Sequence, residues 1–71
     1  MEEFKKIVAD LLDVEMSDIE DDLEQGDIPE WDSVGHLELL MGLSKHYDKK
    51  LSPAKIPELI NLQDIYSFFN E

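Results

Sequence analysis

The sequence predicts an all-α protein, a small four-helix bundle with a long first loop and a short third helix. Apolar residues recur in several stretches at the three- and four-residue spacing of an amphipathic helix, and no stretch alternates convincingly with the two-residue period of a strand. One long and two short connections between the helical segments are typical of a helical bundle. The chain has 71 residues, so we expect a single domain over residues 1–71.

The first helix is predicted at residues 2–12 because its apolar residues are spaced to lie on one face. They are Phe4, Ile7, Val8, Leu11 and Leu12. A long acidic connection follows at residues 13–32, in which ten of the twenty residues are Asp or Glu. Ile19, Leu23 and Ile28 are predicted to anchor this connection on the core.

The second helix is predicted at residues 33–47, with Asp32 as its N-cap. Its expected apolar face comprises Val34, Leu37, Leu40, Met41, Leu43 and Tyr47. His36 falls one turn into this helix and is expected to be exposed. The last helix is predicted at residues 62–70, where Asn61 is positioned to cap it.

The segment between these two helices is less regular. Ser52 followed by Pro53 predicts the N-cap and first position of a short third helix. Pro57 should then break it, because a residue that precedes proline disfavours helical geometry, in this case Ile56.

Composition excludes several classes of function. The formal net charge of −12 argues against binding to nucleic acid and to anionic membrane surfaces, since both need a basic surface. There is no cysteine, and hence no disulfide or protein thiol nucleophile. No apolar stretch is long enough to span a membrane, and the first residues lack a signal-peptide pattern, so a cytoplasmic protein is expected.

The most informative stretch is residues 31–41, which read Trp-Asp-Ser-Val-Gly-His-Leu-Glu-Leu-Leu-Met. It resembles the phosphopantetheine attachment site of acyl and peptidyl carrier proteins, whose signature is Asp-Ser-Leu at the start of the second helix. Asp32 and Ser33 match this signature, and Val34 replaces the leucine. The resemblance spans nearly the whole chain, because helix order, the long first loop, acidity and length also agree.

This resemblance implies a carrier that is not an enzyme. The cargo, an acyl or aminoacyl group, would be held as a thioester on a 4'-phosphopantetheine arm that comes from coenzyme A and is attached to Ser33. Asp32 and Val34 would flank the arm. The implied partners are a phosphopantetheinyl transferase and acyl-loading and acyl-transferring enzymes with basic surface patches. We expect a monomer without catalytic residues or a metal site.

Partner contacts are predicted at Glu30, Trp31, Glu38 and Met41. Trp31 could instead be a hydrophobic staple on the first turn of the helix, and the acidic residues could be an ordinary solvated face. The stretch at residues 28–32 resembles stand-alone carriers of specialised pathways more than the housekeeping carriers of fatty acid synthesis. The family resemblance implies a role in fatty acid or polyketide biosynthesis.

Two further points remain open in the sequence. The alternative to a carrier is a non-catalytic acidic adaptor that binds a basic partner. In a carrier, we expect the cargo to shelter between the helices. The predicted walls of that cavity are Val8, Leu11, Leu37, Met41, Ile60 and Ile65.

Overall fold

A computed structural model describes residues 2–70 of the chain. Its elements in order are α1 (Glu2–Leu12), the 3-10 turn η1 (Met16–Asp18), α2 (Ser33–Tyr47), the 3-10 turn η2 (Pro53–Lys55) and α3 (Leu62–Phe69). Within residues 2–70 there is no strand, so the all-helical prediction is confirmed. The four-helix count is not confirmed, since η2 occupies the place of the expected third helix.

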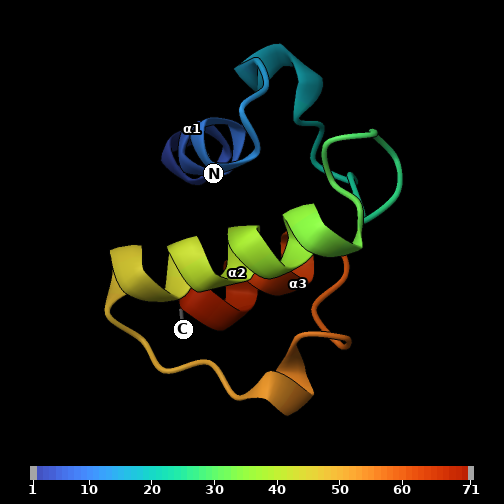
Figure 1. The fold of residues 1–71 in the computed structure, drawn as a ribbon. Coiled ribbons are helices and arrows are strands. Elements are labelled where there is room, and N and C mark those ends of the chain that lie inside the picture. The colour runs from blue at the N-terminus through green and yellow to red at the C-terminus, as the bar shows by residue number, and fades with distance from the viewer. Residues whose placement is uncertain (1, 71) are drawn as a thin grey trace.

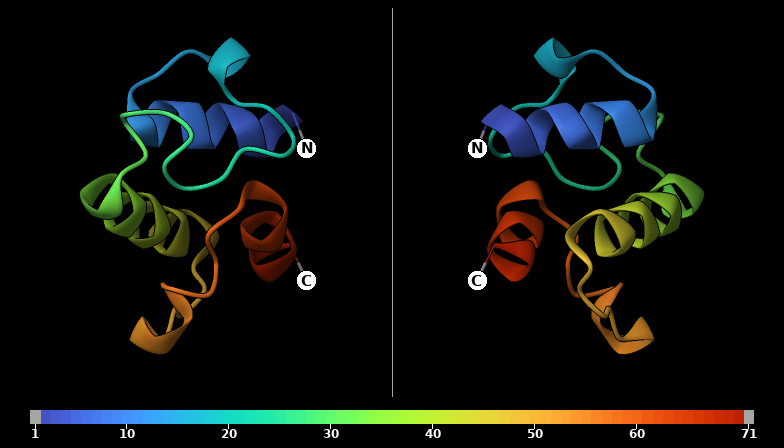
Figure 2. Two further views of the ribbon diagram at one scale, coloured as in Figure 1. Left: turned by 90° about the vertical axis from the view of Figure 1, so that its right-hand side faces the viewer. Right: turned by 90° about the vertical axis from the view of Figure 1, so that its left-hand side faces the viewer.

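The three α-helices form two layers. Figure 1 shows α2 with α3 behind it, and α1 almost end-on above them. The turned views of Figure 2 show α1 lengthwise, crossing above α2 and α3, which lie side by side. The segment that contains η2 lies on the side of α2 and α3 that faces away from α1.

The core lies between these layers. From α1, the buried side chains are Phe4, Val8, Ala9 and Leu12. From α3 they are Leu62, Ile65 and Phe69. Leu11 was expected in the buried stripe of α1, but it is 36% exposed and packs at the edge of the interface beside Gly42.

The buried face of α2 differs from the predicted one. The buried residues are His36, Leu39, Leu40 and Leu43. Val34, Leu37 and Met41 were expected on this face but are 65%, 44% and 61% exposed. The helix carries apolar residues on two faces, and only one of them turns towards the core between α1 and α3.

The first connection is held to the core by three buried side chains, those of Ile19, Leu23 and Trp31. Its backbone also joins the entry to α3, because the amide of Leu62 donates to the carbonyl of Leu23 over 2.8 Å. The second connection, residues 48–61, has one buried side chain, that of Leu59.

The expectation of a non-helical backbone at Ile56 was wrong. Its backbone is right-handed helical, with φ −56° and ψ −49°, although it precedes Pro57. The preference imposed by the proline is overridden here by the closing hydrogen bond of η2, in which the Ile56 amide donates to the carbonyl of Pro53.

Among residues 2–70, no helix has the length and apolar character needed to cross a bilayer.

Candidate functional site

Ser33 is the first residue of α2 and its side chain is exposed. The preceding residue, Asp32, is the N-cap predicted from the sequence, and its carboxylate accepts a hydrogen bond of 2.8 Å from the amide of Gly35. Within residues 2–70 the Ser33 hydroxyl makes no hydrogen bond of its own. A free hydroxyl therefore projects into solvent beside the unpaired backbone N–H groups and positive dipole end of α2.

The loop before Ser33 packs tightly on the first turn of α2. The carbonyl of Glu30 approaches Gly35 so closely that a β-carbon at position 35 would overlap its oxygen. Only glycine fits this approach without displacing backbone. The close contact fixes the direction from which the chain enters the helix, and with it the position of Ser33.

Trp31 belongs to this loop, and it is fully buried, with an exposed fraction of 0%. Its indole Nε1–H donates to Nδ1 of His36 over 2.9 Å, and the two rings are stacked. Burial favours the packing role of Trp31 over the alternative of direct partner contact. His36 is itself 3% exposed, so the expectation of an exposed histidine was wrong.

The other predicted partner residues are on the surface. Glu30, Glu38 and Met41 are all exposed. Beside Ser33, however, the outer face of α2 is apolar, with Val34 and Leu37 on it. Glu38 is the single acidic residue within the helix. Ten of the eighteen acidic residues of the chain lie in the first connection, which ends beside Ser33 with Glu30 and Asp32.

A groove runs along α2 on the same face as Ser33. It has a volume of about 620 Å³. Its lining residues are Leu37, Met41, Ser44, Lys45, Leu51, Pro53 and Ile56. Positions 33, 37, 41 and 44 share one face because they are spaced by three or four residues. The groove therefore begins at Leu37, one turn after Ser33, and extends towards the C-terminal end of the helix, between α2 and the second connection.

Two of the six predicted cavity walls, Leu37 and Met41, line this groove. Val8 and Ile65 are fully buried in the core instead and do not line the groove. Leu11 and Ile60 are partly exposed and do not line the groove.

No family model matches the chain. A search of curated proteins finds similarity to the polyketide-8 synthase acyl carrier protein 2 of Streptomyces avermitilis. The two are 31% identical over 65 residues, which cover 92% of this chain and 75% of the relative. The chain belongs to the acyl carrier protein family.

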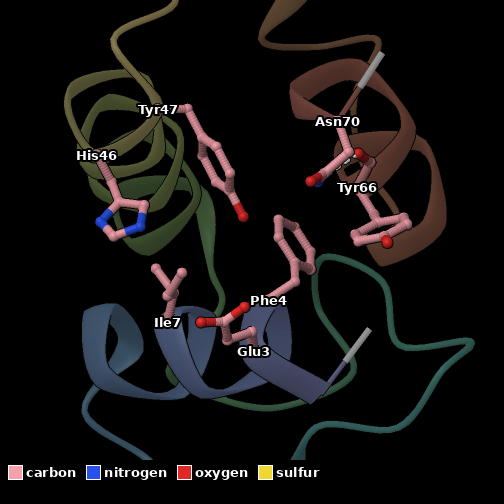
Figure 3. A pocket seen from close by; sticks show the side chains of 7 residues that line it. All are labelled: Glu3, Phe4, Ile7, His46, Tyr47, Tyr66 and Asn70. Atoms are coloured by element: carbon pink, nitrogen blue, oxygen red, sulfur yellow. Dashed lines mark hydrogen bonds between the residues drawn. The ribbon is translucent and has the colours of Figure 1, made fainter.

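Membership of this family gives the chain a carrier role. In an acyl carrier protein, the position of each cavity relative to Ser33 indicates which cavity could receive cargo. A smaller cavity, about 240 Å³, lies between the ends of α1, α2 and α3 and is lined by Glu3, Phe4, Ile7, His46, Tyr47, Tyr66 and Asn70. Figure 3 shows Phe4 and Tyr47 at its centre. His46 and Tyr47 close the C-terminal end of α2, so this cavity is at the end of the helix opposite to Ser33.

Sequence reasoning missed His36 as an organising residue of the site. Its Nε2 lies 2.8 Å from the carbonyl oxygen of Ile56, twenty residues further along the chain. The sequence offers one signal for this role, a histidine five residues after a tryptophan. That spacing does not reveal that the Ile56 carbonyl also bonds to the ring.

Proposed function

We propose that this acyl carrier protein holds its cargo as a thioester on a 4'-phosphopantetheine arm attached to Ser33. The main support is that Ser33, in a chain of this family, has an exposed hydroxyl without a hydrogen bond at the first position of α2. The protein supplies no catalytic residues in this proposal. It acts as one cytoplasmic domain over residues 1–71, as a monomer, and delivers the cargo to other proteins.

Electrostatics favour an anion at this position. In the attachment reaction the Ser33 hydroxyl gives up its proton and its oxygen bonds to the phosphorus on the pantetheine side of the coenzyme A diphosphate. The P–O bond between the two phosphoryl groups breaks, and adenosine bisphosphate leaves with the bridging oxygen. The product is a phosphodiester whose negative charge lies beside the free N–H groups of α2. The Asp32 carboxylate carries the nearest negative charge in the sequence and repels the phosphodiester. It accepts a hydrogen bond from the Gly35 amide, which partly offsets its charge. Asp32 and Val34 then flank the arm on either side.

The arm must supply the thiol, because the chain has no cysteine. The groove supports an acyl cargo over an aminoacyl cargo. Leu37, Met41 and Ile56 present apolar surface along it, and an ammonium group would lose hydration there without a partner. A reduced acyl chain would instead bury apolar area against these side chains.

Partner enzymes are proposed to contact the exposed residues around Ser33. Glu30 and Glu38 provide charge for basic patches, and Met41 provides a flexible apolar contact. Trp31 supports this surface from below through its burial. The partners are a phosphopantetheinyl transferase and enzymes that load and remove acyl groups, as in a fatty acid or polyketide pathway.

Intact mass spectrometry tests the attachment. Incubation with coenzyme A and a transferase of broad specificity should add one phosphopantetheine to the wild-type chain and none to Ser33→Ala. Ser52→Ala is the matched control, because Ser52 is also exposed and precedes a short helical turn, yet it should leave modification intact. A wild-type chain that stays unmodified would favour the acidic adaptor, and modified Ser33→Ala would place the arm elsewhere.

The cargo class is tested by melting. An acyl chain of medium length on the arm should raise the melting temperature above that of the unloaded arm, because a ligand that binds only the folded state stabilises it. An aminoacyl or very short polar cargo should change it little. Equal melting temperatures for all three forms would show that the cargo remains in solvent.

A further inference from the structure

The middle of the second connection, residues 50–59, is weakly attached to the rest of the molecule, whereas the ends of the connection are hydrogen-bonded to it through Lys49 and Ile60. Among residues 2–70, a single hydrogen bond joins residues 50–59 to the remainder, and it links Nε2 of His36 to the carbonyl oxygen of Ile56. The backbone bonds of η2 and its neighbours all close within the segment. Leu59 is its one buried side chain. Attachment therefore depends on modest apolar packing and on this bond.

The same residue, Ile56, also forms part of the groove wall. Its side chain lines the groove while its carbonyl accepts from His36. Movement of this wall away from α2 must lengthen that hydrogen bond. The bond is thus placed to control the width of the groove.

The chemistry of the three groups fixes the direction of both hydrogen bonds. The indole N–H of Trp31 can only donate, so Nδ1 of His36 accepts and carries no proton. The single ring proton of the neutral imidazole is then on Nε2, where it donates to the Ile56 carbonyl. Both nitrogens of the buried His36 ring therefore have a hydrogen-bond partner. The ring connects the loop before Ser33 to the groove wall.

We propose that His36 is a latch, a positioning residue that holds residues 53–59 against α2 and releases the Ile56 carbonyl when cargo widens the groove. The Trp31 bond keeps the ring in place while the Ile56 bond opens. The role of the latch in admitting cargo rests on the proposed function. The hold on residues 53–59 exists in the unmodified chain and can be measured without an arm.

Two variants separate the two bonds. His36→Asn places an amide oxygen near the position of Nδ1, so it can still accept from Trp31 but cannot reach Ile56. His36→Gln places an amide nitrogen near the position of Nε2 and keeps a donor for Ile56. His46→Asn is the control, since His46 is exposed on the last turn of the same helix.

Amide hydrogen exchange by NMR on the unmodified chain gives the readout. In His36→Asn the amides of Ile56, Glu58 and Leu59 should exchange on the order of tenfold faster, as expected for the loss of one buried hydrogen bond. Exchange in α1 should be unchanged, and the resonance of the single indole N–H should remain close to its wild-type position. His36→Gln should restore most of the protection, and His46→Asn should have no effect. Unchanged exchange at residues 56–59 in His36→Asn, or an equal increase in α1, would overturn the latch.

The loaded carrier gives the second readout. A medium-length acyl chain on the arm should perturb the Met41 methyl resonance and the Nε2–H signal of His36 together. A perturbed Met41 with an unchanged Nε2–H signal would mean that cargo enters without release of the latch, which overturns its role. Failure of the Ser33 modification itself would overturn the proposed function and leave the exchange result standing.

Discussion

The connections that precede and follow α2 are both long and both contain a three-residue 3-10 turn, yet they are attached to the core in different ways. Residues 13–32 contribute three buried side chains, Ile19, Leu23 and Trp31, whereas residues 48–61 contribute Leu59 alone. The first connection thus behaves as part of the core, and the second as a movable wall. Buried anchors, rather than regular structure, set the rigidity of these segments.

The largest test of this comparison is Trp31→Ala. Removal of a fully buried tryptophan should lower the free energy of unfolding by about 3–5 kcal/mol, whereas Leu59→Ala in the second connection should cost about 2 kcal/mol. Urea denaturation followed by circular dichroism measures both. Met16→Ala, at a position that is 37% exposed, should cost about 0.5 kcal/mol or less. An equal loss for Trp31→Ala and Leu59→Ala would remove the distinction between the connections.

A second test uses the two glycines of α2. Gly35→Ala should cost about 1–3 kcal/mol, because the new β-carbon meets the backbone carbonyl of Glu30 in the first connection. Gly42→Ala would meet Leu11 Cδ2 at 2.6 Å. That side chain is partly exposed and can move, and alanine gains about 1 kcal/mol of helix propensity over glycine. The expected result in thermal denaturation is a clear loss for Gly35→Ala and a near-neutral Gly42→Ala; the reverse order would contradict it.

The helices could be read from the sequence because their periodicity and caps are local. α1 and α2 have the predicted bounds, α3 ends one residue early at Phe69, and the Asn61 carboxamide oxygen accepts from the Asp64 amide as expected of a cap. The short third helix was not formed as a fourth α-helix. Pro53 starts a turn, but the segment lacks the buried stripe that would extend it.

The site was only partly predictable, because some of its contacts join residues far apart in the sequence and leave no local signal. The exposed position of Ser33 follows from its place at the helix start, whereas its modification remains a prediction. The face of α2 was misassigned because leucines and methionine occur all round the helix, so periodicity could not decide which side meets α1. The burial of His36 depends on a tryptophan and on a carbonyl twenty residues away, and such a contact has no local signal.

A third test concerns the points at which the two connections begin. Asp13 and Asp48 both have left-handed backbones, with φ of 58° and 51°, and each follows the C-terminal end of a helix. Aspartate tolerates this conformation less well than glycine, and its charge opposes the negative end of the helix dipole. Asp13→Gly and Asp48→Gly should each raise the free energy of unfolding by about 0.5–1 kcal/mol. Thermal denaturation of the two variants should give similar gains, and a loss in either would show that the carboxylate has a stabilising partner.

The smallest effect is expected from the ion pair between Lys5 of α1 and Asp21 of the first connection. The Lys5 ammonium hydrogen-bonds to and attracts the Asp21 carboxylate, which lowers the pKa of Asp21 below its ordinary value of 3.8. Because the folded-state pKa is the lower one, the pair stabilises the fold above the unfolded-state value. This stabilisation is lost as the pH falls through the folded-state value.

Asp21→Asn should therefore melt slightly below the wild type at neutral pH and low salt, and the difference should vanish in strong acid or at high salt, since the pair is exposed and screened. Asp22→Asn is the matched control, because Asp22 is also exposed but pairs with no lysine among residues 2–70. It removes a charge from the same acidic stretch and should relieve repulsion, so its melting temperature should equal or exceed that of the wild type. If Asp21→Asn is also stabilising at neutral pH, repulsion among the carboxylates of the first connection outweighs the Lys5–Asp21 ion pair.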